Sequence, residues 1–352
     1  LATGGYGRGG MAPSSDTALL FLRAYKASPH TESVIEYMLY ALWDMGLKVG
    51  NAFRTPAECV KLAAEDVTIK TSLLDSRFIC GDQALSDEMM SKFMKEAVEG
   101  KDAEFIMDKL AERDARHARQ GDARYVVEPN IKEGKGGLRD LQTLYWIVKH
   151  IYGGETLEDV MKGGPFTRSE YTSFIRSAKF MWTVRCHLHY VTGRAEERLS
   201  FDLQPEIAAR MGYRDRTGQL GVERFMKRYF LVSKDVGALT RIIAAKLEAE
   251  QKKKPEGFRR LLPQKTPQAL ADKGFVVDAG RVSITSEDVM KDDPLNMLRL
   301  FIIARREDKD IHPNALSAIT RNLRALNESV RSSDEGRRLI LDAILGSKEP
   351  GL

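Results

Sequence analysis

The chain has 352 residues, which is enough for two or three domains with a large buried core. Hydrophobic residues make up 43% and charged residues 30%, and this balance excludes a disordered chain, a collagen-like repeat and a disulfide scaffold. The formal net charge is +5, and the charges are interspersed along the sequence. Proteins that bind nucleic acids usually gather more positive charge, so we expect no nucleic-acid partner.

Cysteine spacing and apolar runs predict the compartment. Cys59, Cys80 and Cys186 form no CxxC pair, which argues against a zinc site and a disulfide framework. The sequence contains no run of about 18 apolar residues, so no membrane-spanning helix is predicted. The first ten residues lack the basic segment followed by an apolar segment that a secretory signal has. We therefore expect a cytoplasmic protein that does not associate with membranes. The chain starts on Leu1 with residues typical of a strand end, so we expect an N-terminal part of the protein to precede it.

The first predicted element is a glycine-rich loop. Five glycines lie within Gly4–Gly10 beside Arg8, and glycine weakens helices, so we expect no helix interior here. Ser15 and Asp16 follow, and then the apolar run Leu19–Leu22 predicts a strand that is covered on both faces. Backbone N–H groups of such a loop can bind phosphate oxygens, and Asp16 could hold a phosphate-bound Mg²⁺. A structural turn without a ligand is the alternative.

Helix and strand signals alternate next. Apolar residues that include Val34 and Met38 recur at helical spacing and predict a helix over Thr31–Met45, with Thr31 as its N-cap. Leu47–Phe53 predicts a second strand, and Pro56–Ala64 predicts a short helix. This alternation predicts a small α/β unit.

The rest of the chain, from about residue 85, is predicted to be mainly helical, because apolar residues recur every three or four positions. Helices are expected around Leu138–Tyr152, Phe174–Leu188, Phe225–Leu239, Pro294–Ala304 and Ala315–Val330. A Lys-rich break is expected at Gln251–Glu256 and a hairpin around Asp278–Arg281. The fold class is therefore α+β: a small sheet domain followed by a mainly α-helical domain.

A second loop with glycines and bases leads into the helix at Leu138. It contains Lys132, Lys135, Gly136, Gly137, Arg139 and Asp140. Its functional interpretation is contact with a nucleotide triphosphate, because a helix N-terminus attracts anions. The structural alternative is an interdomain hinge in which Asp140 pairs with Arg139 or caps the helix.

Several motifs together resemble one enzyme family. They are Gly4–Gly9 with Ser15 and Asp16, Leu19–Leu22, Leu42–Gly50, Arg77 with Gly81 and Asp82, and Asn130–Gln142. In this order they resemble the polymerase β-like nucleotidyltransferases, and among them the bacterial PII uridylyltransferase/uridylyl-removing enzymes. The resemblance implies an N-terminally incomplete nucleotidyltransferase domain at residues 1–125, a helical domain at 126–250, and a helical extension at 251–352 that leads toward an absent HD domain.

The resemblance implies transfer of UMP from UTP to a tyrosine of the nitrogen-regulatory PII protein, with release of pyrophosphate. An Asp-x-Asp pair binds catalytic Mg²⁺ in this family, but here the triplet is Asp16-Thr17-Ala18. Strand alternation puts positions 16 and 18 on one face, so Ala18 leaves one carboxylate missing, and we expect impaired activity. Engineered inactivation and a natural pseudoenzyme both explain Ala18; a core alanine of an unrelated strand is the structural alternative.

The other implied site residues lie in or near the two glycine loops. Asp66 is expected as the third catalytic carboxylate, with Asp75 as the second choice and a helix cap as the structural interpretation of Asp66. Asp16 is the expected Mg²⁺ ligand. The expected nucleotide-binding residues are Gly4, Gly5, Arg8, Gly9, Ser15, Lys132, Lys135, Gly136 and Arg139.

Two further functions stay open: an adenylyltransferase that acts on glutamine synthetase, and a non-catalytic module that binds UTP or PII. Cys186, His187 and His189 do not predict a metal site, because three residues at this helical spacing cannot all face one ion. None of the six histidines is followed by aspartate, so the uridylyl-removing and glutamine-sensing functions of the family are not expected of this chain alone.

Overall fold

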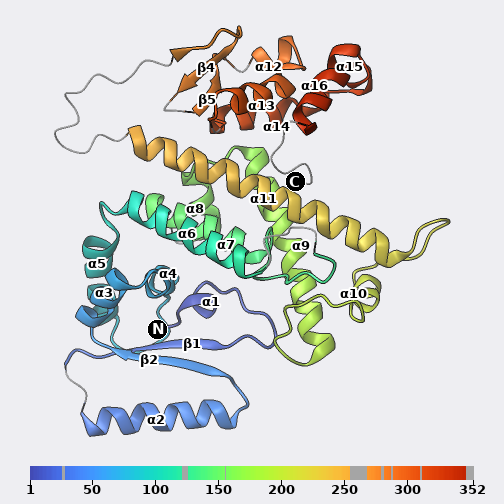
Figure 1. Cartoon of the computed structure of the whole chain (residues 1–352). Coiled ribbons are helices and arrows are strands. Elements are labelled where there is room, and N and C mark those ends of the chain that lie inside the picture. The colour runs from blue at the N-terminus through green and yellow to red at the C-terminus, as the bar shows by residue number, and fades with distance from the viewer. Residues whose placement is uncertain are drawn as a thin grey trace, which may run out of the picture. The chain divides into compact units, whose positions relative to one another are not determined.

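A computed structural model describes the chain in eight ranges: 1–25, 28–120, 126–154, 156–253, 268–278, 281–286, 288–309 and 311–345. The chain divides into two units, Leu1–Thr240 and Arg241–Leu352 (Figure 1). Helices dominate the described residues of both units, and each unit also contains a small sheet, which confirms the α+β class. The first unit includes the predicted sheet domain and most of the predicted helical domain.

The sheet of the first unit forms around two parallel strands, β1 (Thr17–Leu22) and β2 (Val49–Arg54), with Ala18 opposite Gly50. The start of the chain runs antiparallel along the other edge of β1: Thr3 N donates to Ala18 O at 3.0 Å. Both predicted strands are confirmed. Leu20 is buried, but the other residues of β1 are half-buried, so the expectation of a strand covered on both faces is wrong for most of it.

Helices lie on both sides of this sheet. Figure 1 shows α2 (Pro29–Asp44) on one side of β1 and β2, and α1 (Gly4–Gly7), α3 (Pro56–Glu65) and α4 (Val67–Leu74) on the other.

Helix α2 differs from its prediction in two respects. Its N-cap is Ser28, whose Oγ accepts from Thr31 N at 3.2 Å, so the assignment of the cap to Thr31 is wrong. Proline at the first helical position, Pro29, allows this earlier start. The residues Val34 and Met38 are 44% and 42% exposed, because the two-stranded sheet covers little of the helix.

Helix α1 corrects the expectation that the glycine-rich segment contains no helix. Gly7 N donates to Thr3 O and Arg8 N donates to Gly4 O, which closes one helical turn. Gly7 has to be glycine, because a Cβ there would overlap the carbonyl oxygen of Asp75. Close approach of two backbone segments therefore matters more than helix propensity at this position.

The first unit contains further helices. They are α5 (Gln83–Phe93), the π-helix Met94–Val98, α6 (Asp102–Arg119), α7 (Leu138–Tyr152), α8 (Leu157–Gly163), α9 (Arg168–Thr192), α10 (Gln204–Arg210) and the first part of α11 (Gly221–Lys253). Among them, α7 has ten of its 15 residues buried and packs against α6, α8 and α9. The predicted break at Gln251–Glu256 is wrong for residues 251–253, which continue α11; residues 254–256 lie outside the described ranges.

The second unit has a sheet of β3 (Gln268–Ala269), β4 (Phe275–Asp278) and β5 (Arg281–Ile284). Antiparallel pairing of β4 and β5 confirms the predicted hairpin, whose two turn residues lie outside the described ranges. Its described helices are α12 (Val289–Asp292), α13 (Asn296–Arg306), α14 (Pro313–Asn322), the 3₁₀ turn Leu323–Ala325, α15 (Glu328–Arg331) and α16 (Asp334–Leu345).

One helix of the second unit was predicted too long. Ala315–Val330 is expected to be continuous, but α14 ends at Asn322 and a new helix, α15, begins after Asn327. The Asn327 side chain accepts from Val330 N at 3.1 Å, and this cap starts α15.

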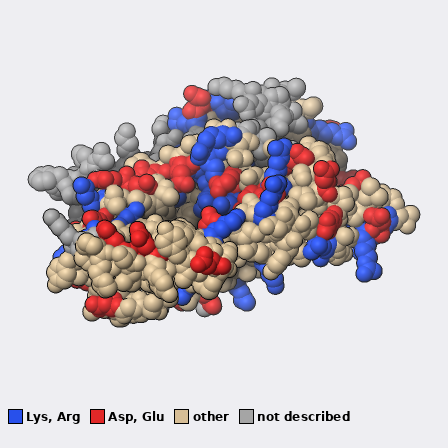
Figure 2. All heavy atoms as spheres, turned by 90° about the horizontal axis from the view of Figure 1, so that it is seen from below, with Lys and Arg blue, Asp and Glu red and all other residues tan. Residues whose placement is uncertain are grey.

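The surface mixes charges of both signs. On the face seen in Figure 2, Lys and Arg side chains alternate with Asp and Glu among wide areas of other residues. Among the described residues, none of the helices has the length and apolar character needed to cross a bilayer.

Candidate active site

The glycine loop and Asp16 lie at the same end of β1. Leu1–Thr3 runs antiparallel to β1 with Thr3 opposite Ala18, so the chain turns into Gly4 and Gly5 beside the start of the strand. Asp16 directly precedes that start, and its side chain is exposed. Within the described ranges, no hydrogen bond or ion pair engages its carboxylate. Loop amides and a free carboxylate thus share one sheet edge.

This edge offers one carboxylate and lacks a second. Alternation of side chains along β1 puts position 18 on the face of Asp16, but Ala18 has no oxygen to offer a metal. Asp66 is engaged as the N-cap of α4, since its Oδ1 accepts from Thr68 N at 2.6 Å. In the part of the chain that the structure describes, no three His, Cys, Asp or Glu residues cluster to hold a metal ion. The residues present therefore fit one ligand of a Mg²⁺ site and not the pair.

Helix α9 anchors the segment just before Asp16. His189 Nδ1 accepts from Ser14 N at 3.2 Å, and Arg185 Nη2 lies 3.5 Å from Ser15 Oγ. Glu197 accepts from Arg185 at 2.6 Å and lies 3.6 Å from His189 Nε2. Burial lowers the pKa of His189, so the ring is neutral at pH 7 and its Nδ1 is free to accept.

Sequence reasoning missed this anchor. In the sequence, His189 stands out only as a possible metal ligand beside Cys186 and His187, and no metal site is predicted there. The available signal was the spacing of Arg185 and His189, which are four residues apart and therefore lie on one face of a helix. The partner segment is 175 residues away in sequence, so no local pattern pointed to it.

Arg8 is held in place by α4 and α7. Its guanidinium pairs with Asp75 and lies 5.4 Å from the ring centroid of Trp146, and Trp146 Nε1 donates to Asp75 Oδ2 at 2.8 Å. Burial raises the pKa of Asp75, although Arg8 opposes that shift. Asp75, the second choice for a third metal ligand, is therefore the partner of a basic residue in the glycine loop.

A cavity of about 920 Å³ opens behind the glycine loop. Gly7–Gly10 form one wall, and side chains of α7 and α9 form much of the rest. Arg8 and Gly9 line this cavity, whereas Asp16 and Ser15 do not.

The second loop folds on itself. Asn130 Oδ1 accepts from Lys132 N at 3.0 Å and from Glu133 N at 2.7 Å. The Arg139 guanidinium donates to Glu133 Oε1 at 3.1 Å and to Gln142 Oε1 at 2.9 Å. Lys132 Nζ lies 3.8 Å from the same glutamate. The positive charges expected to face a nucleotide are thus close to an internal carboxylate.

Asp140 connects this loop to α6. It is buried, accepts from Gly136 N at 2.8 Å and from His117 Nε2 at 2.9 Å, and pairs with Arg116. The expected pairing of Asp140 with Arg139 is therefore wrong. Burial would raise the pKa of Asp140, but the hydrogen bond and charge of His117, together with Arg116, outweigh it and hold the pKa below its usual value.

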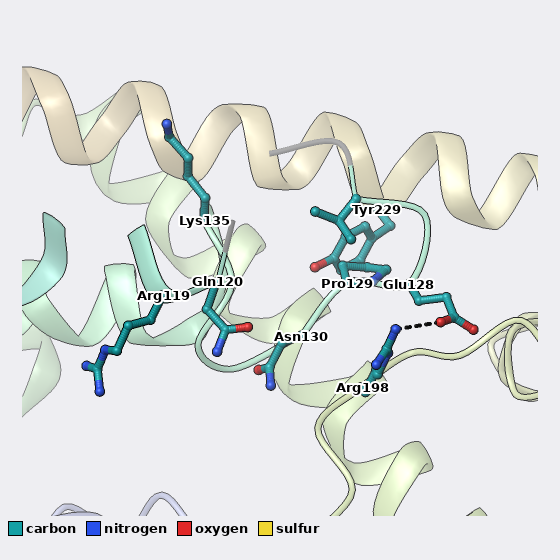
Figure 3. A pocket seen from close by; sticks show the side chains of 10 residues that line it. Arg119, Gln120, Glu128, Pro129, Asn130, Lys135, Arg198 and Tyr229 are labelled. Atoms are coloured by element: carbon teal, nitrogen blue, oxygen red, sulfur yellow. Dashed lines mark hydrogen bonds and ion pairs between the residues drawn. The ribbon is translucent and has the colours of Figure 1, made fainter. Parts of the chain in front are cut away.

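Helix α11 closes the same loop from the other side. Gly136 has φ +79°, and a Cβ there would overlap Ser233, whose Oγ donates to Lys135 O at 3.0 Å. The Lys135 side chain lines a separate cavity of about 360 Å³, shown in Figure 3, where Arg198 and Glu128 form an ion pair at 2.7 Å. The structure therefore does not bring Lys135 into the cavity of Arg8 and Gly9.

Comparisons with known proteins agree with the motifs. The family model described as GlnD PII-uridylyltransferase matches residues 104–244, and the one described as Uridylyltransferase GlnD third domain matches residues 275–350. Bifunctional uridylyltransferase/uridylyl-removing enzymes of Phenylobacterium zucineum and Caulobacter vibrioides are each 52% identical over 99% of this chain. The chain spans 38% and 37% of the length of these relatives. It belongs to the GlnD PII-uridylyltransferase family and corresponds to a part of these longer enzymes.

Proposed function

We propose that this chain carries the nucleotidyltransferase part of a PII uridylyltransferase, which transfers UMP from UTP to a tyrosine of a PII protein. The tyrosyl oxygen attacks the α-phosphorus in line, the bond to the pyrophosphate oxygen breaks, and the tyrosyl proton is lost. The observation that carries the proposal is the register of Leu1–Thr3 on β1, because it puts the glycine-loop amides and Asp16 at one sheet edge.

The chain's own residues supply binding and orientation. In this proposal the amides of Gly4 and Gly5 bind phosphate oxygens, and Ser15 contributes its hydroxyl. Gly9, which was also expected to bind the nucleotide, is left out because its N–H donates to Tyr6 O at 3.2 Å. Asp16 is the residue that would hold Mg²⁺, which when bound neutralises charge on the triphosphate. The second loop keeps α7 in place, since Arg139 and Asp140 are engaged inside the protein.

Ala18 favours a second candidate, a module that binds UTP or PII without transferring UMP. A missing carboxylate weakens metal binding far more than it weakens contacts from backbone amides. Both the transferase and the binding module would therefore bind the nucleotide, but only the transferase would transfer UMP.

Restoring the carboxylate separates these candidates. Incorporation of radiolabelled UMP into PII should rise by several orders of magnitude in Ala18→Asp, since metal-assisted charge stabilisation contributes several kcal/mol. Thr17→Asp is the matched control, because it adds the same charge one residue away on the opposite strand face. Incorporation of AMP into glutamine synthetase by Ala18→Asp would favour the adenylyltransferase instead. Absence of nucleotide binding in both forms would contradict every nucleotide-based candidate.

A further inference from the structure

We infer that the 920 Å³ cavity behind the glycine loop is the subsite for the uridine part of the nucleotide, an inference that rests on the proposed function. Its volume lies at the upper end of the range of small-molecule sites. Apolar side chains form much of its wall, namely Leu138, Leu141, Tyr145, Phe174, Ala178 and Trp182. The loop that we assign to the phosphates also forms one wall of this cavity, so a single nucleotide can contact both.

Most polar side chains in the wall already have partners within the protein. Arg8 pairs with Asp75, and Ser76 Oγ donates to Met90 Sδ. Arg77 donates to the carbonyl oxygen of Gly7 at 3.3 Å. Thr156 belongs to the capping box of α8. Because these groups are engaged within the protein, a ligand would be recognised by the polar groups of the wall that have no such partner.

The remaining acceptor is Asp75 Oδ1. Asp75 is 2% exposed, and although its Oδ2 is engaged, its buried Oδ1 has no hydrogen-bond partner. Leaving a buried acceptor unpaired costs free energy, so native proteins rarely do so without a reason. A ligand N–H group would satisfy this oxygen.

Three further donors lie on the face of α7 that lines the cavity. Gln142 has its Oε1 engaged by Arg139, which leaves the amide NH₂ as a donor. Lys149 makes no hydrogen bond or close ion pair among the described residues, although its charge interacts with that of Asp75, and its ammonium lies 5.6 Å from the ring centroid of Tyr145. Burial raises the pKa of Tyr145 to about 12, so its hydroxyl keeps its proton. Spacings of three and four residues place all three side chains on one helix face.

This set of groups complements uracil. The imide edge of uracil has one ring N–H donor between two carbonyl acceptors, and the cavity offers one carboxylate acceptor among several donors. Cytosine lacks that ring N–H and presents an unprotonated ring nitrogen instead, which would repel Asp75 Oδ1. The apolar walls suit the flat faces of the base.

Two variants test the subsite without removing the Arg8–Asp75 pair. Lys149→Met removes a donor while keeping the apolar stem, and Ala178→Phe fills part of the cavity. Titration of uridine, Mg·UTP, Mg·CTP and inorganic tripolyphosphate should show at least tenfold weaker binding of uridine and UTP in both variants. Tripolyphosphate binding should stay within about twofold, and the unmodified chain should prefer UTP to CTP by at least tenfold.

The controls are Lys135→Met, which alters the lysine of the other cavity, and Thr172→Phe, which adds the same ring on an exposed position of α9. Both should bind uridine like the unmodified chain, and thermal unfolding should confirm that all variants fold. The inference is overturned if uridine does not bind at millimolar concentration, if both variants bind it unchanged, or if UTP and CTP bind equally. The proposed function fails separately, when Ala18→Asp does not transfer UMP to PII.

Discussion

The two glycine loops of the first unit share glycines and basic residues, but their surroundings differ. In Gly4–Gly10 the space beside Gly9 is open and the loop borders a large cavity. In Asn130–Gly137 the corresponding space is filled, because α11 packs on Gly136 and Asp140 binds the backbone from within. A Cβ added at Gly9 would meet open space, whereas Gly136, like Gly7 in the first loop, permits close packing. Composition alone does not separate these two uses.

The two loops share one feature, an arginine that is paired within the protein. Arg8 pairs with Asp75, and Arg139 pairs with Glu133, so each guanidinium has a carboxylate inside the protein. Only the first loop also keeps an exposed acid, Asp16, at the sheet edge beside it. We therefore expect variants of the second loop to change stability and variants of the first to change nucleotide binding.

Asp140→Asn should have the largest effect. Loss of this charge leaves Arg116 and His117 buried beside a neutral amide, which should cost about 3–5 kcal/mol of the free energy of unfolding at pH 7. Because the pKa of Asp140 is held low in the folded state, its stabilising effect is present above the unfolded pKa of about 4 and is lost as the pH falls through the folded value.

Urea unfolding combined with hydrogen exchange in α6 and α7 measures this effect for the first unit alone. The difference in the free energy of unfolding between the unmodified chain and Asp140→Asn should become smaller below about pH 4. An equal difference at pH 7 and pH 3 would show that the charge of Asp140 does not stabilise the loop.

Gly136→Ala should come next, at about 3 kcal/mol, because a left-handed backbone conformation and an overlap with Ser233 add together. Gly9→Ala is the matched control, since Gly9 has a similar φ of +72° but nothing within 4 Å of the added Cβ. Its cost should be about 1 kcal/mol, from backbone strain alone. Equal midpoints of urea unfolding for the two variants would show that the two glycines do not differ in how tightly they are packed.

His189→Ala should lower stability by about 2 kcal/mol, because Ser14 N loses its acceptor and a buried ring is removed. It should also weaken Mg·UTP binding, since Ser15 and Asp16 follow the anchored residue. His189→Asn keeps an acceptor and should restore part of the affinity.

His187→Ala, two residues away on α9, controls for general effects on the helix. Calorimetric titration and thermal unfolding of the three variants report the two effects separately. If His189→Asn binds nucleotide as weakly as His189→Ala, the hydrogen bond to Ser14 does not position the acid segment.

Lys132→Gln should have the smallest effect, below about 0.5 kcal/mol on stability, because its contact with Glu133 is long and partly exposed to solvent. We also expect less than about a twofold change in the dissociation constant for Mg·UTP, which equals about 0.4 kcal/mol. A tenfold loss of affinity would show that the second loop does contact the nucleotide, as the sequence motif implies.

The sequence predicted features that depend on neighbouring residues. Local patterns of apolar residues, together with the proline at a helix start, predicted β1, β2, α3 and α7. It did not predict which acid meets which base: Asp75 lies 67 residues from Arg8, and Asp140 pairs with α6 instead of its neighbour Arg139.

Such pairings depend on how helices and strands pack together. Packing between distant segments produces no regular spacing of residues that the sequence could show. The helical conformation of Gly4–Gly7 was missed for the same reason, since the approach of the Asp75 backbone is a contact between distant segments. The register of Leu1–Thr3 on β1 also comes from the structure, although the proximity of the glycine loop and Asp16 was expected from the motif order.

A calorimetric titration of UTP, with and without Mg²⁺, into this chain, Ala18→Asp and Asp16→Asn tests most directly whether the glycine loop and Asp16 bind one Mg²⁺–nucleotide. We expect that this chain binds UTP, that Mg²⁺ strengthens binding, that Ala18→Asp increases this strengthening and that Asp16→Asn abolishes it. Mg²⁺-independent affinity that is equal in all three proteins, or no binding in any of them, would contradict this expectation.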